Sequence, residues 1–432
     1  MPSVGFAGMT HLGLVSAAAC ASRGFHTRCY DSDAELIERL RRGEWESVLF
    51  EPGFAELITS AHEFVSFTSD VRELVKCDLV YVARDTGIDE EGHANTSGVS
   101  KIATCVAPHL ARHATLVILS QVPPGFTRGL ARTLGLFPSR VYCQAETLVF
   151  GASVERACFP ERLIIGCANP SDTIDGAFGR VLSAFDCPVL RMSYESAELT
   201  KIAINVCLAA SITATNVLSG IASRVGADWG EIAPALRLDK RIGVHAYLTP
   251  GLGIGGGHLT RDLVTVSEIA KRTKGRGYVN EADAIDAMLR DSVNRQFWPL
   301  RMLKESVLYT VSDPVIGVLG VTYKKNTQSV RNSPSIALIK QLVGTRLRVF
   351  DPAVIAPTQP GLVNAESMES VALGADALVI MTPWPVFRTL DVERVGRDMR
   401  GRIIIDPFGV LDHERVRAAG FRHFVLGRSN DA

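Results

Sequence analysis

The chain has 432 residues, of which 47% are hydrophobic and 21% are charged. A chain of this length exceeds the size at which one hydrophobic core keeps growing, so we expect two or three globular domains. Lys and Arg together number 46, as do Asp and Glu. This balance excludes the strong global field that draws nucleic acid or an anionic membrane to a protein, although a local basic patch can still bind a phosphorylated small molecule.

The N-terminus and the cysteines indicate a cytoplasmic protein. The first residues, MPSVGFAGMTHLG, run directly into a strand and a turn, without the basic and apolar regions of a secretory signal. We expect no membrane span, because no apolar run looks long and uninterrupted enough. The nine cysteines include no C-x-x-C pair and lie mostly in apolar or helical stretches. They therefore favour reduced thiols over disulfides or a metal site, and we expect no metal.

Short β-rich apolar runs alternate with amphipathic helical stretches through about the first 190 residues, a rhythm typical of βαβ units. Such units predict a parallel sheet that is covered on both faces. The predicted buried strands span residues 4–7, 26–30, 79–83, 115–120 and 163–166.

Residues 194–225 then form an Ala-rich stretch without proline, which predicts a helix too long for a crossover. We interpret it as a spine between two domains and as a surface for a homodimer. Further helical segments are predicted at residues 228–237 and 259–309, separated by a glycine-rich stretch at 250–258. From Pro314 the βαβ rhythm restarts, with strands predicted at 315–319, 346–350, 377–381 and 402–405 and a helix at 335–342.

The predicted fold class is therefore α/β, with two Rossmann-like, doubly wound parallel-sheet domains joined by a long central helix and a helical bridge. The predicted boundaries are 1–193 for the first domain, 194–310 for the central helical domain and 311–432 for the last domain.

A glycine-rich turn follows the first predicted strand and opens a helix. Glycines at such a turn let the backbone approach a pyrophosphate at the helix N-terminus. Asp31 closes the second strand, where a carboxylate accepts a hydrogen bond from the adenosine ribose and repels a 2′-phosphate. We therefore predict that the cofactor is NAD rather than NADP, although Thr10 stands where the middle glycine is usual. The predicted cofactor contacts are Gly8, Thr10, His11, Leu12, Gly13 and Asp31.

Two threonines, Thr86 and Thr127, follow predicted strands at the carboxyl edge of the sheet, where ligands bind in such folds. Either can contact the cofactor or an active-site water, or serve as a turn or cap residue. A second glycine pair, Gly317 and Gly320 with Asp351, lacks a third glycine. It favours a Rossmann-like fold used for the base of a nucleotide sugar over a second NAD site.

Further segments resemble the UDP-glucose/GDP-mannose dehydrogenase family, in order and spacing, over essentially the whole chain. Residues 146–151 (ETLVFG) are similar to the family's EFLREG segment, and residues 159–162 (FPER) to its nPdR segment. Glu198, Lys201 and Asn205 match E-x-x-K-x-x-x-N on one helix face. The remaining matches are 239–243 (DKRIG) to D-x-R-I-G, 253–262 (GIGGGHLTRD) to G-x-G-G-S-C-F-x-K-D, and 323–327 with 331–334 to F-K-x-x-T-x-D-x-R-x-S-P.

The resemblance implies a nucleotide-sugar substrate and a role for each matching residue. Lys201 and Asn205 would hold the reacting oxygen or a catalytic water, with Lys201 stabilising an alkoxide or oxyanion. Asp262 would act as a base or orient the water, and Glu146 would assist proton movement. The other implied contacts are Gly253, Gly255 and Gly256 to the diphosphate, Lys324 to the nucleotide or sugar, Arg241 to substrate at a subunit interface, and Arg331 to the cofactor side.

His258 stands where the family has its nucleophilic cysteine. The family reaction is a four-electron oxidation of a primary alcohol to a carboxylate through a thioester, which requires an activated thiol. Residues 250–262 contain no cysteine, and Gly257 stands where the family has the serine that precedes its cysteine. The usual D-G-R-N reads DPFG at 406–409, which removes an arginine that the family uses at the substrate site.

Three functions stay open. Redox at a secondary alcohol through a keto sugar, by an epimerase or a two-electron dehydrogenase, is favoured, with His258 as acid or base because imidazole exchanges protons near neutral pH. The alternatives are uronate formation and a non-catalytic nucleotide-sugar-binding protein. Retention of Glu146, Lys201, Asn205 and Asp262 counts against the last of these.

Overall fold

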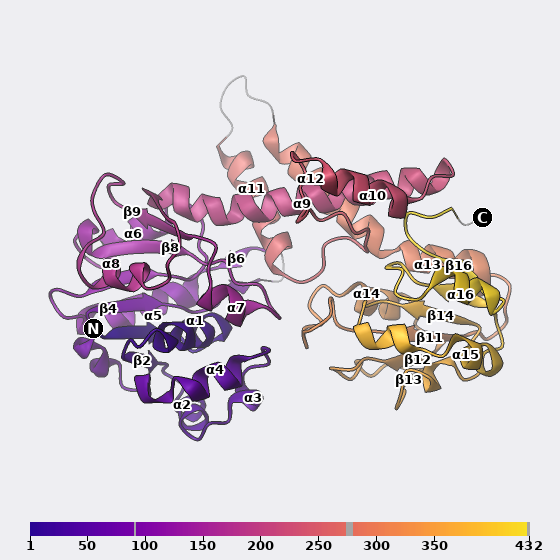
Figure 1. Cartoon of the computed structure of the whole chain (residues 1–432), viewed down its shortest axis with the longest axis horizontal. Coiled ribbons are helices and arrows are strands. Elements are labelled where there is room, and N and C mark those ends of the chain that lie inside the picture. The colour runs from indigo at the N-terminus through magenta and orange to yellow at the C-terminus, as the bar shows by residue number, and fades with distance from the viewer. Residues whose placement is uncertain (90–91, 274–279, 430–432) are drawn as a thin grey trace. The chain divides into compact units, whose positions relative to one another are not determined.

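The computed structural model describes residues 1–89, 92–273 and 280–429. The chain divides into two units, Met1–Ile204 and Asn205–Ala432 (Figure 1). The boundary falls inside the long helix α9 (Tyr194–Arg224). The division into domains at 1–193, 194–310 and 311–432 stays a prediction.

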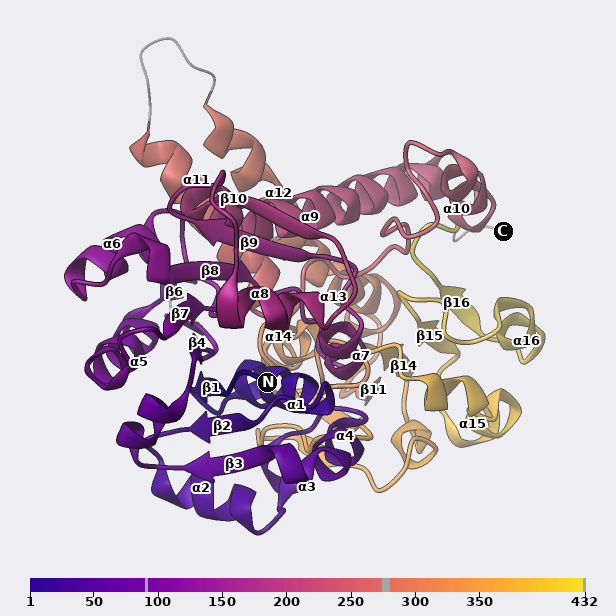
Figure 2. The same cartoon turned by 60° about the vertical axis from the view of Figure 1, so that its left-hand side comes forward.

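The first unit is built on an eight-stranded sheet in the order β10-β9-β8-β7-β4-β1-β2-β3, which Figure 2 displays strand by strand. Neighbouring strands are parallel except β8 and β9, which are antiparallel and so depart from the predicted all-parallel sheet. The strand order reverses between β1 and β4, which places the ligand crevice of such a sheet at their carboxyl ends. The strands are β1 (Val4–Ala7), β2 (Thr27–Tyr30), β3 (Val65–Thr68), β4 (Leu79–Val82), β7 (Thr115–Ile118), β8 (Val141–Ala145), β9 (Leu163–Cys167) and β10 (Val189–Ser193).

Helices cover both faces of this sheet, so its central strands are apolar on both sides. Phe6 and Val117 belong to one core cluster, whereas Val80 and Ile118 belong to another, as the alternation of side chains along a strand requires. The helices are α1 (His11–Ser22), α2 (Ala34–Arg41), α3 (Trp45–Val48), α4 (Phe54–Ser60), α5 (Ser97–Val106), α6 (Phe126–Thr133), α7 (Ser153–Cys158) and α8 (Gly176–Ser183). Shorter elements are η1 (His62–Phe64), η2 (Val71–Lys76), η3 (Ala107–His109), η4 (Pro138–Arg140) and the hairpin β5 (Gly87–Ile88) and β6 (Ala94–Asn95).

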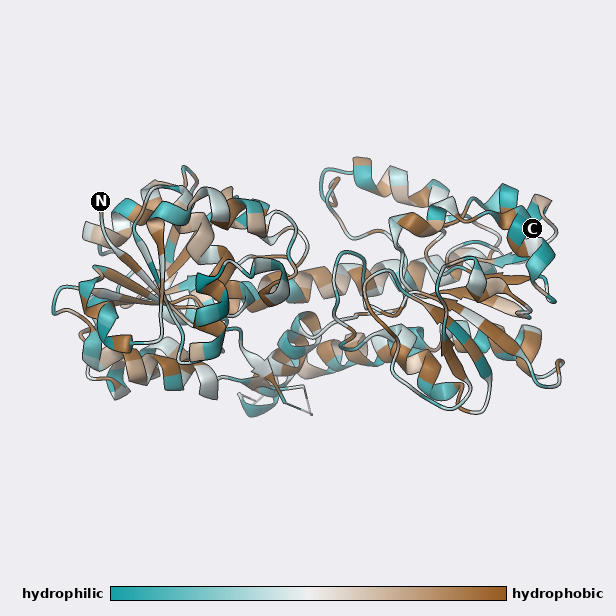
Figure 3. Ribbon diagram, turned by 90° about the horizontal axis from the view of Figure 1, so that it is seen from below, coloured by the Kyte–Doolittle hydropathy of each residue, from teal (hydrophilic) through white to brown (hydrophobic). Residues whose placement is uncertain are grey.

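The second unit contains a six-stranded sheet in the order β13-β12-β11-β14-β15-β16, with all neighbours parallel. Its strands are also apolar on both faces, and Figure 3 colours the strands of both sheets largely brown. The strands are β11 (Val315–Leu319), β12 (Arg346–Phe350), β13 (Leu362–Asn364), β14 (Ala377–Ile380), β15 (Ile403–Ile405) and β16 (Arg422–Phe424). The helices around them are α14 (Pro334–Gln341), η6 (Ser370–Ala372), η7 (Pro385–Thr389), α15 (Val392–Asp398) and α16 (His413–Ala418).

The predicted spine is confirmed as α9, which runs over 31 residues without a break. The helices that follow are α10 (Trp229–Leu238), α11 (His258–Arg272), α12 (Glu281–Gln296), α13 (Trp298–Leu303) and the π-helical turn η5 (Lys304–Leu308). Residues 274–279 of the predicted helical stretch 259–309 lie outside the described residues.

Among the described helices, α9 is long and apolar enough to cross a membrane by length and composition. This corrects the expectation that no segment of the sequence meets that test. One such helix is weak evidence for a span, because the core helix of a non-membrane protein meets the same test. The buried polar side chains Glu198, Lys201 and Asn205 on α9 also argue against lipid around its N-terminal half.

Candidate active site

The turn between β1 and α1 requires glycine at two positions. Gly8 has φ +103°, and a Cβ there would lie 3.0 Å from the Cβ of Arg84. A Cβ on Gly13 would lie 1.9 Å from the carbonyl oxygen of Gly8. The tight turn directs the first N–H groups of α1 toward the ligand crevice, so this part of the fold fits a dinucleotide pyrophosphate.

The carboxylate of Asp31 is buried beside this turn and keeps capacity for a ligand. Its Oδ2 accepts the backbone N–H of Met9 at 2.8 Å, and its Oδ1 accepts that of Asp33 at 3.1 Å. Because a carboxylate offers about four acceptor sites, these two bonds leave room for a ribose hydroxyl. The geometry is thus compatible with the predicted NAD contact.

Asp351, the counterpart of Asp31 in the second unit, accepts more hydrogen bonds from the protein itself. Its Oδ2 accepts the backbone N–H groups of Val321 at 2.7 Å and Thr322 at 3.1 Å. The same oxygen accepts the indole N–H of Trp384 at 3.2 Å. This carboxylate holds its own loop, which supports the interpretation that the β11 turn is not a second NAD site.

Asp85 makes an unexpected contact at the dinucleotide turn. Its backbone N–H donates to the hydroxyl of Thr10 at 2.8 Å, and its Oδ2 lies 3.4 Å from the backbone N of Leu12. A carboxylate therefore stands at the N-terminal end of α1, where the helix favours negative charge. A bound pyrophosphate would compete with Asp85 for this amide.

His11 and Glu51 form a buried pair at the start of α1. The imidazole Nε2 lies 2.9 Å from Glu51 Oε2, and the ring contacts Phe150 at a tilt of 40°, with centroids 4.3 Å apart. Glu51 also accepts the backbone N–H groups of Gly151 at 3.1 Å and Ser153 at 2.8 Å. The pair thus ties the predicted cofactor turn to segment 146–151, a link that sequence reasoning missed.

Replacing Glu51 by Gln is expected to lower stability at neutral pH and to flatten its dependence on pH. Burial alone raises the pKa of the Glu51 carboxyl, but hydrogen bonds from His11, Gly151 and Ser153 outweigh it, so the pKa is lowered. A lowered carboxyl pKa stabilises the fold above the unfolded-state pKa, and this stabilisation is lost as pH falls through the folded-state pKa. Urea unfolding of both proteins between pH 7 and pH 3 checks this. An equally steep loss in the variant would contradict it.

The two threonines at the sheet edge are mostly used inside the protein. Thr86 donates its hydroxyl to the carbonyl of Gln121 and is buried. Thr127 is 0% exposed, and its contact to a cofactor or an active-site water stays a prediction. Its backbone N–H donates to Glu198 Oε1 at 2.8 Å, and Gly125 N–H donates to Oε2 at 2.6 Å. Glu198 therefore caps α6, and burial raises the pKa of its carboxyl.

Lys201 and Glu146 form an ion pair in the first unit. Lys201 Nζ lies 3.0 Å from Glu146 Oε1, and the two side chains are 11% and 16% exposed. Glu146 Oε2 accepts the backbone N–H of Leu148 at 2.8 Å, which fixes the carboxylate. A cation and a carboxylate held this way can stabilise an alkoxide and exchange its proton.

Asn205 and Asp262, two of the predicted catalytic residues, contact each other in the second unit. The Asn205 amide donates to Asp262 Oδ2, and Arg261 Nε lies 3.0 Å from Oδ1. The side chains of Arg261 and Asp262 are each 2% exposed. Asp262 is therefore held as a buried, paired carboxylate, oriented through both of its oxygens.

In the glycine-rich loop before α11, neighbouring residues occupy the space that side chains at the glycines would need. At Gly253 (φ +82°) a Cβ would lie 2.4 Å from the Ser292 carbonyl oxygen, and at Gly256 (φ +77°) one would lie 2.8 Å from Tyr323 Cε2. A Cβ on Gly255 would lie 3.1 Å from Cδ2 of the same tyrosine ring. These glycines thus have a packing reason as well as the predicted role beside a diphosphate.

Further predicted substrate residues gather at this loop. Lys324 Nζ lies 5.6 Å from the ring centroid of Tyr323. A Cβ on Gly251 would lie 3.7 Å from Phe408, the residue that stands in place of the family's arginine. His258 is the first residue of α11 and is exposed. The loop, Lys324 and the altered DPFG segment therefore share one region of the second unit.

Two predicted arginines lie at the surface. The Arg241 side chain is 88% exposed and pairs with Asp239 at 2.7 Å. Arg331 is also exposed. Their predicted contacts, to substrate at a subunit interface and to the cofactor side, stay predictions. Within the part of the chain that the structure describes, no cluster of three His, Cys, Asp or Glu is suited to a metal, and the cysteines are free thiols.

Three family models match successive parts of the chain. They describe the NAD binding domain (residues 3–181), the central domain (195–287) and the UDP binding domain (317–413) of UDP-glucose/GDP-mannose dehydrogenases. The chain belongs to this family. It is thus an enzyme of the NAD-dependent nucleotide-sugar dehydrogenase type, with a domain for a nucleotide-sugar substrate.

Similar proteins extend over the full length of the chain. UDP-glucose 6-dehydrogenase TuaD of Bacillus subtilis is 28% identical over 99% of this chain and 94% of its own length. A UDP-glucose dehydrogenase structure from Pyrobaculum islandicum is 28% identical, with a TM-score of 0.85 over 99% of this chain and 98% of that one. A UDP-D-ManNAc dehydrogenase from Pyrococcus horikoshii, 24% identical with a TM-score of 0.84 over 99% of this chain and all of its own, has the same fold.

Proposed function

We propose that this family member oxidises a secondary alcohol of a nucleotide-activated sugar by one hydride transfer, as an epimerase or a two-electron dehydrogenase. The observation that carries the proposal is His258, at the first residue of α11 and at the position of the family's nucleophilic cysteine. An imidazole is a poor substitute for a thiol that must form and release an acyl group. A ketone needs no such nucleophile.

The residues then have defined tasks. Bound NAD supplies the hydride acceptor. The Lys201 ammonium holds the alkoxide oxygen, and the hydroxyl proton passes toward Glu146, 3.0 Å from that nitrogen. Asp262, fixed by Arg261 and Asn205, orients the water or hydroxyl group beside it. The balance is one C–H and one O–H bond broken, one C=O bond formed, one hydride to NAD and one proton to the protein.

In the epimerase version, the hydride returns to the opposite face of the ketone and the proton returns to its oxygen. His258 suits the acid/base exchange in either version, because imidazole gives and takes protons near neutral pH. The proton-handling pairs Lys201–Glu146 and Asn205–Asp262 are formed, which argues against a non-catalytic sugar-binding protein.

Uronate formation is the second candidate. It is favoured by the names of the relatives, since TuaD and the enzymes of Rickettsia bellii and Rhizobium meliloti are UDP-glucose 6-dehydrogenases. A 6-dehydrogenase reaction oxidises a primary alcohol by two hydride transfers, so counting the NADH formed separates it from the proposal.

Incubation of the pure protein with NAD and a panel of UDP-, GDP-, ADP- and CDP-sugars is expected to yield at most one NADH per sugar. NADH absorbance and product NMR give the result. One NADH with a keto sugar identifies the two-electron dehydrogenase, and an inverted carbon without net NADH identifies the epimerase. Two NADH and a uronate would overturn the proposal, as would binding of sugar without turnover.

The variant His258→Cys sharpens this test. With a secondary-alcohol substrate the product is a ketone, which has no hydrogen on the carbonyl carbon for a second hydride transfer. The new thiol therefore cannot promote further oxidation, and the amount of NADH formed per sugar is expected to stay unchanged. A second NADH and a carboxylate product would instead reveal a primary alcohol.

We also propose that the chain forms a homodimer through α9. An exposed apolar stripe lies near the end of this helix and continues just past it. Its members are Val217 (39% exposed), Leu218 (49%) and Ile221 (42%) on α9 and Val225 (71%) directly after it. Light scattering of the wild type and of an Ile221→Glu variant tests the proposal, which a monomeric wild type would overturn.

A further inference from the structure

A cavity of about 420 Å³ lies within the second unit, away from the glycine-rich loop residues. Its walls come from the end of α9, the end of α12, α13 and the segment after β16. Four arginines line it, namely Arg224, Arg295, Arg301 and Arg428, and we refer to it as the arginine pocket.

The positive charge of the arginine pocket is only partly compensated. Arg295 pairs with Asp291 at 3.3 Å, and Arg428 pairs with Asp228 at 3.2 Å. Neither Arg224 nor Arg301 has a carboxylate within ion-pair distance among residues 1–89, 92–273 and 280–429. The pocket thus holds more guanidinium groups than carboxylates, which is the charge balance of an anion site.

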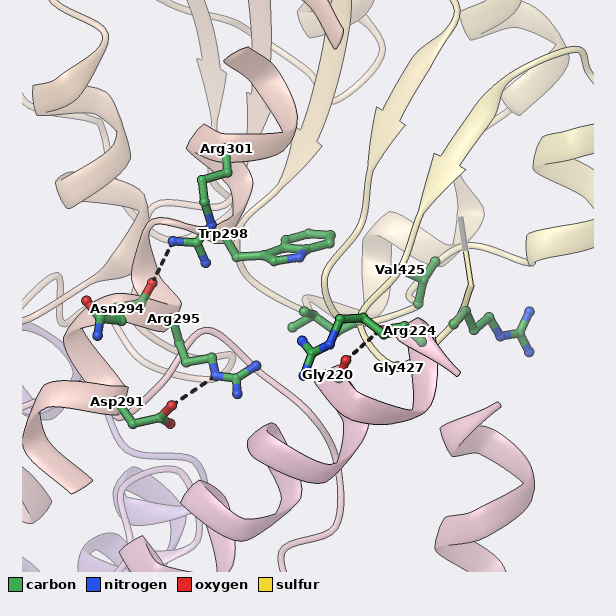
Figure 4. Close-up of a pocket in the computed structure, with 12 residues that line it drawn as sticks. Gly220, Arg224, Asp291, Asn294, Arg295, Trp298, Arg301, Val425 and Gly427 are labelled. Atoms are coloured by element: carbon green, nitrogen blue, oxygen red, sulfur yellow. Dashed lines mark hydrogen bonds and ion pairs between the residues drawn. The ribbon is translucent and has the colours of Figure 1, made fainter. Parts of the chain in front are cut away.

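Gly220 brings two of these guanidinium groups together. A Cβ at this position would lie 3.2 Å from Arg295 Nη1 and 3.9 Å from Arg224 Nη1. The absence of a side chain at Gly220 leaves room for both guanidinium groups beside it, and Figure 4 shows the two arginine side chains at the cavity wall, from α9 and α12. Two like charges beside the same residue repel each other, so an anion that contacts both is stabilised.

An aromatic surface adjoins the cations. Trp298 lines the same cavity, and Figure 4 shows its indole on the side of the pocket that carries Arg301. Arginine forks match phosphate oxygens, and an indole face stacks on a nucleobase. The volume lies within the range of about 300–1,000 Å³ that is typical of small-molecule pockets.

We propose that the arginine pocket binds a nucleoside polyphosphate, with its phosphates on Arg224, Arg295 and Arg301 and its base on Trp298. Such a site is additional to the predicted NAD turn in the first unit and to the proposed nucleotide-sugar site at the glycine-rich loop. It does not depend on which sugar the enzyme oxidises.

Calorimetric titration of the full chain with ATP, at saturating NAD, tests the proposal. ATP is expected to bind, and tripolyphosphate is expected to bind about tenfold more weakly because it has no base for Trp298. Trp298→Ala should remove that difference. Absence of ATP binding, or equal affinities for ATP and tripolyphosphate, would overturn the proposal.

Three variants assign the binding to this cavity. Arg224→Gln is expected to weaken ATP about tenfold or more, and Gly220→Glu to abolish binding by placing a carboxylate between the cations. Arg290→Gln, an exposed arginine of α12 outside the pocket, is the matched control and should leave ATP affinity unchanged. Unaltered NAD affinity and circular dichroism establish that the variants are folded. ATP affinity that survives Gly220→Glu in the folded variant would place the site elsewhere and contradict the proposal.

Discussion

Replacing Lys201 by Met is expected to lower kcat by about 10²–10⁴-fold, while the affinity for NAD stays unchanged. The reason is local, because Lys201 offers the mostly buried ammonium group beside Glu146, at 3.0 Å. Methionine keeps the length of the side chain and removes the charge that would stabilise an alkoxide. Steady-state kinetics on the substrate found by the nucleotide-sugar panel, with NAD binding measured separately, checks the prediction.

Two further variants test whether the effect is specific to Lys201 and its partner. Lys76, an exposed lysine of the same unit that pairs with Glu73, is the matched control, and Lys76→Met should retain full activity. Glu146→Gln keeps the shape of the carboxylate but removes its ability to accept a proton, so the pH–rate profile should lose its acidic limb. If Lys201→Met changed only KM, the lysine would bind substrate equally in ground and transition states, and the proposed role would be wrong.

The sheets were predictable where apolar runs are continuous, because strands buried on both faces have no polar alternation. β1 and β11, buried along their whole length, have the predicted bounds, and α9 ends one residue before its predicted end. β12 also has its predicted bounds, although buried residues alternate with more exposed ones along it. β3 was missed because its residues are half exposed, and β8 because buried and half-exposed residues alternate along it. The antiparallel pairing of β8 and β9 depends on how the chain returns through α7, which no local pattern records.

The site was predictable only where family motifs or short spacings mark it. The resemblance marks both Asn205 and Asp262, but their contact and the ion pair of Asp262 with Arg261 are visible only in the structure. Glu51 contacts His11 and Ser153 across large separations in the sequence, so no spacing points to it.

The same limit applies to the glycines of the loop before α11. From the sequence alone, the resemblance implies that they contact a diphosphate, whereas the structure shows that Tyr323 and Ser292 occupy the space of the absent side chains. The residue that fills this space is set by the tertiary structure. A glycine in the sequence indicates a close approach at that position but does not identify the approaching residue.

Removing the carboxylate of Asp262 is expected to lower the free energy of unfolding by about 3–5 kcal/mol. Its partner Arg261 is 2% exposed, so the Asp262→Ala variant removes a carboxylate from beside a buried cation. The amide of Asn205 loses its acceptor in the same step. Urea denaturation at neutral pH measures the loss, and hydride transfer to NAD should fall with it because the oriented carboxylate is gone.

A double variant separates stability from chemistry at this position. Combining Asp262→Ala with Arg261→Met removes both charges, and apolar replacement of a buried pair restores most of the stability. Activity should nevertheless stay low, since the proposed role of Asp262 depends on its oxygens. Glu393→Ala, which breaks an exposed ion pair with Arg415 in the same unit, is the control and should change stability very little. Recovery of activity together with stability in the double variant would reduce Asp262 to a structural residue and leave Lys201 and Glu146 as the proton-handling pair.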